Sequence, residues 1–294
     1  MRDLTDAGPA AIAAERARIP HQGLGAEILS RQGSDGSWRR AGEPVWLPTL
    51  FTLLLLRATG VDHAEPAVES AVARLEAALG WSDQDGWELR GPEFGGKPFF
   101  DGEVEPCING GVLALGGYFG RPSSRLARSL IGEQLEDGGW NCEAPQSTRS
   151  SFHTTICVLE GLLEYERAAG PSPEIAAARQ RAEEYLLERG LFRRRSTGEV
   201  ANPAFLELAF PPRYHYDVLR ALDYLRAAGV QADARVRDAV GFIESRRQAD
   251  GRWLLDRAYD EALPFAWSET VGEPSRWNTL RALRVLRWWE LGGL

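Results

Sequence analysis

The side chains best suited to chemistry stand near the beginnings of strongly apolar segments. These segments cover residues 44–59, 105–119, 150–169, 212–228 and 274–290. Near their starts stand Trp46, Cys107, His153, Tyr214, His215, Tyr216, Asp217, Trp277 and Asn278. Thiols, imidazoles and carboxylates bind metals and transfer protons, and aromatic faces suit hydrocarbon chains and cations. The chemistry therefore depends on whether the segment starts come together in space.

The five apolar segments have the pattern of buried helices. Stretches such as TLFTLLLL and CINGGVLALGGYF are apolar on almost every side, as expected for helices covered on both sides. Amphipathic segments with one charged face, such as 64–79 and 172–188, alternate with them. This alternation predicts two concentric helical layers in a single all-α domain over residues 1–294. An open superhelix of helix pairs is the other packing considered.

A degenerate motif precedes several of the apolar segments. Gln, three residues, Gly, one residue and Trp occur at Gln32–Trp38 and again at Gln134–Trp140. A third copy ends at Trp253 with Arg247 in place of Gln, and a fourth keeps only Asp-Gly-Trp, ending at Trp87. The Gly turns the chain after a short helix, and the Gln is expected to cap exposed backbone groups. The motif predicts repeated helix–turn–helix units.

Composition narrows the partners and the compartment. The chain of 294 residues has 42 acidic and 34 basic residues, and its net charge of -8 argues against nucleic acid and anionic membranes as partners. The longest apolar run is too short to span a bilayer, and the N-terminus has no secretory signal pattern. Three cysteines do not suggest a disulfide framework. These features predict a cytoplasmic protein.

The spacing of Gln, Gly and Trp resembles the QW repeat of squalene–hopene and oxidosqualene cyclases. The beta subunits of protein farnesyl- and geranylgeranyltransferases are similar to these cyclases in their ring of helices. The resemblance implies an α/α toroid, or barrel, of five to six helical hairpins in the terpenoid cyclase and protein prenyltransferase superfamily. It covers most of the chain and concerns architecture, which does not fix function.

A second resemblance concerns a metal. In the prenyltransferase beta subunits, an Asp-x-Cys pair opening one inner helix and a His opening the next hold zinc. Glu105-Pro106-Cys107 and Phe152-His153-Thr154 are similar to these motifs, although Glu replaces Asp and the spacing is shorter. The resemblance implies a zinc site of Glu105, Cys107 and His153, with Cys142 as a replacement or fourth ligand. Three protein ligands leave one position open for a substrate thiolate or water.

Further roles follow from the other segment starts. His215 and Asp217 are interpreted as a base, an acid or a supporting pair, with capping or core packing as the alternative. Trp46, Tyr214, Tyr216 and Trp277 are interpreted as substrate-binding aromatics, because the aromatic set is typical of rings that hold isoprenoids. Packing is again the alternative.

Two expected motifs are missing from the sequence. It has no Asp-x-Asp-Asp for protonating an alkene and no Asp-Asp-x-x-Asp for magnesium diphosphate, and Asp101, Glu103 and Glu105 replace the basic residues that precede the zinc cysteine. We therefore carry three hypotheses. The first is a zinc-dependent enzyme acting on a small apolar or thiol-bearing substrate. The second is a cyclase-like enzyme with Asp217 or Glu105 as its acid, and the third is a non-catalytic toroid that binds a hydrophobic ligand or a protein.

Overall fold

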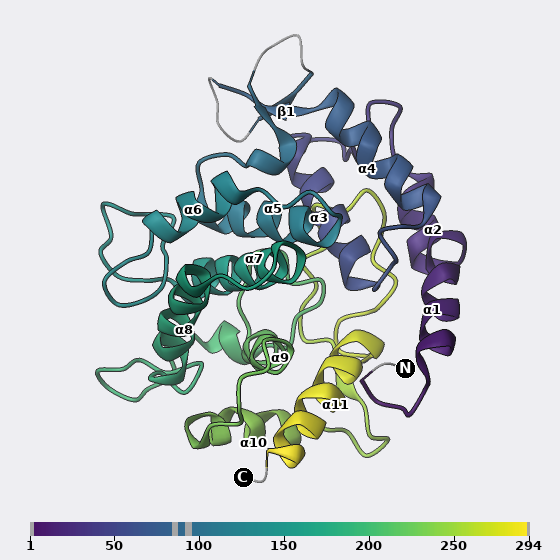
Figure 1. Ribbon diagram of the computed structural model, residues 1–294. Coiled ribbons are helices and arrows are strands. Elements are labelled where there is room, and N and C mark those ends of the chain that lie inside the picture. Colours follow the sequence, from purple (N-terminus) through teal and green to yellow (C-terminus); the bar gives the residue numbers. More distant parts are fainter. Residues whose placement is uncertain (1–2, 84–87, 92–95, 293–294) are drawn as a thin grey trace.

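The helices are arranged in two layers. The structure is a computed structural model that describes residues 3–83, 88–91 and 96–292. Within these residues, the inner layer in Figure 1 consists of α3 (Trp46–Ala58), α5 (Pro106–Tyr118), α7 (Phe152–Ala169), α9 (Val218–Ala227) and α11 (Arg276–Leu291). The outer layer consists of α2 (Gly23–Ser30), α4 (Pro66–Ala78), α6 (Ser124–Gly132), α8 (Pro173–Leu187) and α10 (Arg237–Ser245), with α1 (Pro9–Arg18) beside α2.

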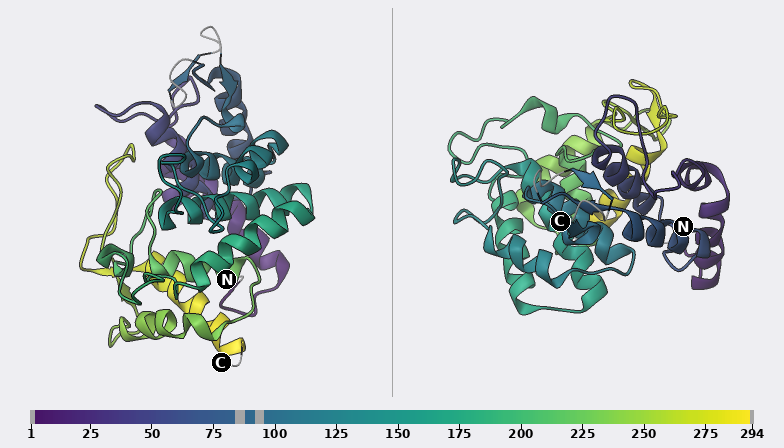
Figure 2. Two further views of the ribbon diagram at one scale, coloured as in Figure 1. Left: turned by 90° about the vertical axis from the view of Figure 1, so that its left-hand side faces the viewer. Right: turned by 90° about the horizontal axis from the view of Figure 1, so that it is seen from above.

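The two ends of the chain meet, which closes the layers into a ring. Asp3 pairs with Arg284 of α11 at 2.7 Å. Arg40 donates hydrogen bonds to the carbonyl oxygens of Asp260 and Leu263, both at 2.9 Å. Figure 2 shows the purple N-terminal helices at one edge of the ring, across from the green helices of the middle of the chain. The predicted fold class, an α/α toroid of five to six hairpins, is confirmed, and the open superhelix is excluded.

Short elements connect the helices. The antiparallel pairs join β1 (Gly80–Trp81) to β2 (Leu89–Arg90) and β3 (Lys97–Pro98), and β4 (Trp253–Leu254) to β5 (Pro274–Ser275). Gly80 lies opposite Arg90 and Pro98 in the first sheet. The 3-10 turns are η1 (Ile19–His21), η3 (Phe99–Asp101), η4 (Pro203–Leu206) and η5 (Ala234–Val236).

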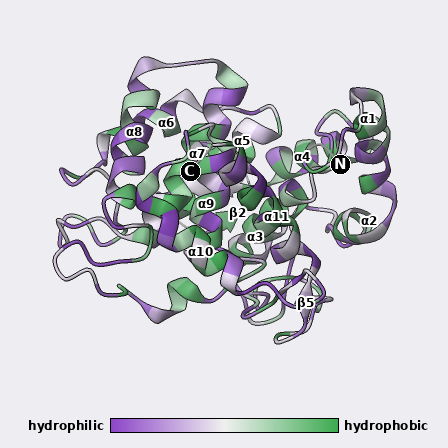
Figure 3. Ribbon diagram, turned by 90° about the horizontal axis from the view of Figure 1, so that it is seen from below, coloured by the Kyte–Doolittle hydropathy of each residue, from purple (hydrophilic) through white to green (hydrophobic). Residues whose placement is uncertain are grey.

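The inner layer packs tightly because α5 and α7 approach each other through glycines. A Cβ atom on Gly110 would lie 2.4 Å from the carbonyl oxygen of Cys157, and one on Gly161 would lie 2.5 Å from that of Gly110. Figure 3 shows hydrophobic residues concentrated along the inner helices, whereas the outer helices alternate in hydropathy. This close contact fixes the start of α5 relative to the start of α7.

The Gln and Trp of the repeated motif anchor each turn. The Nε2 atom of Gln32 donates to the carbonyl oxygens of Gly36 and Ala71, and Gln134 bonds Gly138 and Ala178 in the same way. The expectation that Gln caps backbone groups is confirmed. The indole N–H groups of Trp38, Trp140 and Trp253 each donate to the carbonyl oxygen ten residues earlier. The fourth copy, ending at Trp87, lies outside the described residues.

One predicted helix begins later than the sequence indicated. The segment expected to be helical over 212–228 becomes helical only at Val218. Arg213 has a φ of 49°, in the left-handed region, which no helical residue adopts. Asp217 then caps α9 by accepting a hydrogen bond from the Arg220 N–H at 2.7 Å. Tyr214, His215 and Tyr216 therefore stand in a loop before the helix.

Candidate functional site

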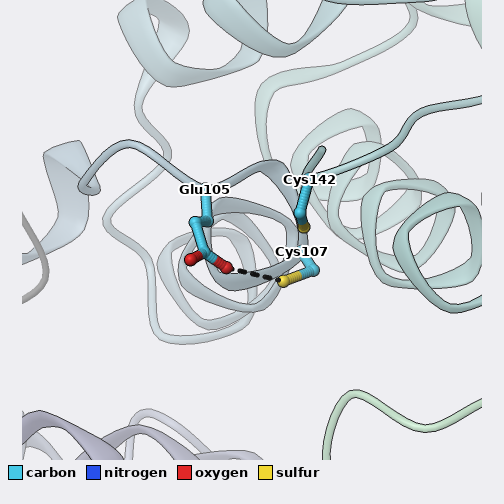
Figure 4. Close-up of side chains that lie close together, drawn as sticks. All are labelled: Glu105, Cys107 and Cys142. Carbon is cyan, nitrogen blue, oxygen red and sulfur yellow. Dashed lines mark hydrogen bonds between the residues drawn. The ribbon is translucent and has the colours of Figure 1, made fainter. Parts of the chain in front are cut away.

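Three potential metal ligands gather at the first turn of α5. One ligand atom each of Glu105, Cys107 and Cys142 lies within 4.8 Å of the other two. The Cys107 Sγ donates a hydrogen bond to Glu105 Oε2 at 3.6 Å, and Figure 4 shows the two side chains pointing toward each other with Cys142 beside them. All three side chains are half-buried. We call these residues the rim cluster.

The start of α5 is held by its own sequence. Glu105 is the N-cap residue and Pro106 takes the first helical position, where its missing N–H costs nothing. The carboxylate of Glu103 accepts hydrogen bonds from the backbone N–H groups of Val104 and Glu105. Burial is the largest cause that raises the pKa of Glu103, to about 7. The turn that presents Glu105 is therefore ordered by a buried carboxyl group that the sequence analysis did not assign.

Cys142 comes from the turn that follows Trp140. Its Sγ lies 3.4 Å from the Thr154 Oγ1 in the first turn of α7. The backbone N–H of Trp140 donates to Thr155 Oγ1 at 3.1 Å, so two adjacent threonines tie this turn to α7. These contacts bring Cys142, which is 35 positions beyond Cys107 in the sequence, into the rim cluster.

The two thiols of the rim cluster differ in their ease of ionisation. A hydrogen bond to Cys142, together with burial, raises the pKa of Cys107. The same hydrogen bond lowers the pKa of Cys142. Cys142 therefore ionises more easily than Cys107. A metal ion binds thiolates, so it would displace the thiol protons.

The rim cluster fits a tetrahedral zinc ion. With Zn–S near 2.3 Å, tetrahedral ligand atoms lie roughly 3.5 Å apart, and the 3.6 Å separation of the Cys107 and Glu105 atoms agrees with this. Two thiolates and one carboxylate are a donor set that zinc accepts, and three ligands leave one position open. The cluster supplies two of the residues that the resemblance implied, with Cys142 as the third.

His153 lies at the start of α7 but is directed elsewhere. Its Nδ1 atom accepts a hydrogen bond from the backbone N–H of Tyr216 at 2.8 Å. Its ring lies edge-on to Phe205 and His215, at centroid distances of 5.4 and 5.7 Å. Burial is the largest cause that lowers the pKa of His153. The structure therefore places His153 on the same rim as Cys107 and outside the group of three ligand atoms.

The two residues interpreted as catalytic lie in the loop before α9. The ring of His215 is stacked between Tyr214 and Tyr259, at 4.2 and 3.6 Å. Burial is the largest cause that lowers the pKa of His215, to about 3. Asp217 is 1% exposed, caps α9 and lies 3.7 Å from Arg281. Burial raises its pKa despite this arginine.

The aromatics interpreted as substrate-binding are spread over several environments. Tyr216 is buried and its hydroxyl donates to the carbonyl oxygen of Leu191. Tyr214 is 39% exposed, and Trp46 lies 6.4 Å from Trp81. Trp277 stacks on Phe210 at 4.7 Å and lines a large cavity. Among the four, within the described part of the chain, Trp277 alone lines this cavity.

The cavity lies inside the ring and has a volume of about 1010 Å³. On α5 it reaches only Tyr118, the last residue of the helix, whereas the rim cluster is at the first turn. Eleven residues at 1.5 Å each separate Cys107 from Tyr118, or roughly 16 Å along the helix axis. Along α5, the rim cluster and the cavity therefore lie at opposite ends of the helix, although the cavity also reaches Trp277 near the start of α11.

Charged residues of the inner helices line this cavity, and the sequence analysis missed them. Glu160, Glu164 and Arg167 follow helical spacing on α7, and Arg281 and Arg284 follow it on α11. Polar residues repeating at i, i+4 and i+7 within otherwise apolar helices were the available signal.

Comparisons with known proteins concern the fold. No family model matches the chain, and no curated protein matches it. A solved protein from Actinoplanes has 17% identity and a TM-score of 0.47, covering 96% of this chain and 85% of that chain. The type II terpene cyclase MstE from Scytonema has 18% identity and a TM-score of 0.44, covering 94% of this chain and 86% of that chain.

A further solved structure contains a ligand. An MstE variant in complex with its substrate, geranylgeranyl dihydroxybenzoate, has 18% identity and a TM-score of 0.45, covering 97% of this chain and 86% of that chain. These neighbours include a type II terpene cyclase, a member of the superfamily that the sequence resembles. In the described residues, every helix is too short or too polar to cross a bilayer.

Proposed function

We propose that the chain is a zinc-dependent enzyme whose metal is held by Glu105, Cys107 and Cys142. The observation that carries the proposal is the group of three ligand atoms within 4.8 Å at the first turn of α5. A zinc ion bound there would supply a Lewis acid with one open position, which suits a thiol-bearing substrate. The predicted cytoplasmic location is part of this proposal, since free thiols persist in reducing compartments.

The chain's own groups would keep the ligands in place. Glu103 fixes the backbone of Glu105, and Thr154 contacts the Cys142 sulfur. The α5 N-terminus carries partial positive charge, which stabilises negatively charged groups beside it. His153 and His215 lie next to each other on the same rim, and their lowered pKa values keep both neutral at neutral pH. We retain His215 as a proposed proton acceptor.

The metal is tested with the purified full chain. We expect the wild type to retain about one zinc ion after supplementation and desalting, and Cys107→Ser or Cys142→Ser to weaken binding at least 100-fold. Cys157→Ala is the matched control, because the Cys157 Sγ donates to the Tyr214 carbonyl oxygen and is not in the rim cluster. A wild type without zinc contradicts the proposal. Loss of zinc in His153→Ala but not in Cys142→Ser contradicts the ligand set.

The open coordination position is tested with cobalt in place of zinc. Thiolate ligation to Co²⁺ produces charge-transfer absorption, so 2-mercaptoethanol should increase this absorption. Ethylene glycol, its thiol-free analogue, should leave it unchanged. Equal spectra with both compounds would remove the thiol-bearing substrate from the proposal.

A cyclase-like enzyme is the second candidate, and the size of the cavity favours it. The difficulty with this candidate is the residue that would donate the proton. Asp217 does not line the cavity, and its carboxylate already caps α9. Of the carboxylates that do line it, Glu160 pairs with Arg220 and Glu164 with Arg167, at 2.9 and 2.8 Å. Burial alone would raise the pKa of Glu160, but the Arg220 guanidinium lowers it overall, which does not suit a proton donor. The zinc proposal therefore ranks first.

A further inference from the structure

Two of the three cysteines of the chain lie side by side in the rim cluster. The Sγ atoms of Cys107 and Cys142 lie within 4.8 Å of each other, and both side chains are half-buried. An S–S bond is about 2.05 Å long, so the two sulfur atoms need to approach by less than about 3 Å to form one. Rotation about the two Cα–Cβ bonds moves sulfur atoms over distances of this order.

The backbone that carries each of these thiols is held in place. Cys107 stands in the first turn of α5, which packs closely on α7. Cys142 follows Asn141, whose side chain closes a turn. The Asn141 Oδ1 accepts a hydrogen bond from the Glu143 N–H at 3.0 Å, and its Nδ2 donates to the Arg149 carbonyl oxygen at 2.8 Å. The fold therefore holds the two thiols together, although they are far apart in the sequence.

The third cysteine, Cys157, has different surroundings. It is 5% exposed, and its Sγ donates to the Tyr214 carbonyl oxygen and accepts from the Arg220 guanidinium, both at 3.6 Å. The rim cluster borders solvent instead, since Val104, next to Glu105, is 58% exposed. Accessible thiols are oxidised selectively, whereas buried structural thiols are inert. The chain therefore has one accessible thiol pair and a third thiol that serves as an internal reference.

A disulfide between the paired thiols would remove two of the three proposed zinc ligands at once. Zinc binds the thiolate form of cysteine, and a disulfide contains no thiolate. Glu105 would be the remaining ligand, and protein zinc sites require three or four. A zinc ion and a disulfide therefore exclude each other in the rim cluster.

We propose that Cys107 and Cys142 form a reversible disulfide, with hydrogen peroxide as the oxidant, and that this disulfide releases the zinc ion. One sulfur attacks a peroxide oxygen, the O–O bond breaks, and a sulfenic acid and water form. The second thiol attacks the sulfenic sulfur, which forms the S–S bond and a second water.

The electrons and protons of this reaction balance. The two sulfurs lose two electrons, which the two peroxide oxygens gain. The thiol protons leave in the two waters, and in the zinc-bound form these protons come from solvent as Zn²⁺ departs. Small thiols reverse the reaction by thiol–disulfide exchange. The release of zinc rests on the proposed function, whereas the disulfide does not.

Peroxide treatment of the metal-free full chain tests the disulfide. Alkylation of the remaining thiols and peptide mapping by mass should find the Cys107 and Cys142 peptides joined, with Cys157 alkylated only after unfolding. Dithiothreitol should restore both thiols. Cys157→Ala is the matched control and should form the same disulfide within about twofold of the wild-type rate, because a buried thiol takes no part. The absence of a disulfide, or a link from Cys157 to either of the other two, overturns the proposal.

The same treatment of the zinc-loaded chain tests the release of zinc. A chromogenic chelator should detect about one zinc ion for each disulfide formed, and dithiothreitol should restore zinc binding. A chain that forms the disulfide and keeps its zinc overturns the proposed release. Zinc binding without a Cys107–Cys142 disulfide overturns this inference and leaves the proposed function intact. A chain that binds no zinc but forms the disulfide contradicts the proposed function and supports the thiol pair as a site of oxidation.

Discussion

The two ends of the inner helices carry different charged groups. Glu105 and Cys107 stand at the N-terminus of α5, whereas Arg57, Arg167 and Arg226 stand in the last turns of α3, α7 and α9. A helix carries partial positive charge at its N-terminus and partial negative charge at its C-terminus. Anionic ligand groups are therefore stabilised at one end of the layer and cations at the other.

This comparison shows that the two ends of the inner layer differ chemically. Parallel inner helices give the ring two chemically different rims without any change of fold. The acidic and thiol groups suit a metal cation, whereas the arginines at the other end pair with carboxylates such as Glu164 and Asp223. The following predictions test the metal site, the packing of the inner helices and the titration of His215.

The largest expected effect is stabilisation by zinc. Free zinc at about 1,000 times its dissociation constant should raise the free energy of unfolding by about 4 kcal/mol. In Cys107→Ser a 100-fold weaker site would reduce this gain to about 1.4 kcal/mol at the same zinc concentration, and greater weakening would reduce it further. Chemical denaturation with and without zinc measures it. An equal gain in the variant would mean that zinc binds elsewhere.

The next largest effect concerns the packing of α5 against α7. Gly110→Ala should lower the free energy of unfolding by about 2 kcal/mol or more, because the new methyl group meets the Cys157 carbonyl oxygen at 2.4 Å. Gly111→Ala is the control, since its methyl group would meet the end of the Leu54 side chain at 3.4 Å. That change should be neutral or stabilising by up to about 1 kcal/mol. Equal destabilisation by the two changes would contradict the close approach of α5 and α7.

A further prediction is that stability depends on pH through His215. The pKa of His215 is lowered to about 3, from a usual value of 6.5. Between these values the unfolded chain binds more protons, so this residue's stabilising contribution is present above pH 6.5 and decreases as the pH falls. In His215→Phe the proton uptake on unfolding should fall by up to roughly one. Unfolding measured from pH 7 to pH 4 gives the slope.

The exposed His63 supplies the control for this experiment. Its side chain is 52% exposed, and His63→Gln should keep the wild-type slope. The slope is the informative quantity, because replacing His215 also changes its stack between Tyr214 and Tyr259 and so shifts stability at every pH. A His215→Phe slope equal to that of the wild type would show that His215 titrates normally.

The sequence predicted the ring because its signals are periodic. Apolar residues on every side of the inner helices require cover on both sides, and this follows from residue type and spacing. The closeness of Cys107 to Glu105 also follows, since the two are neighbours on one helix start. The single domain and the catalytic roles of His215 and Asp217 stay predictions.

Side-chain direction at the rim was harder to predict. His153 stands in the first turn of α7, in the same register as Cys107 on α5. Its Nδ1 accepts a hydrogen bond from the backbone N–H of Tyr216, which directs the ring away from the rim cluster. That bond depends on a loop 63 residues later in the chain. Cys142 reached the cluster through a turn held by Thr154 and Thr155, so the sequence offered it only as an alternative ligand. The cavity was missed because the helical spacing of Glu160, Glu164 and Arg167 within an apolar helix was not used as a signal.

The most direct test of the account is X-ray absorption at the zinc edge on the zinc-loaded full chain. The account predicts two sulfur scatterers at about 2.3 Å and one protein oxygen at about 2.0–2.2 Å, from Cys107, Cys142 and Glu105. A single sulfur together with the multiple-scattering pattern of an imidazole would contradict it.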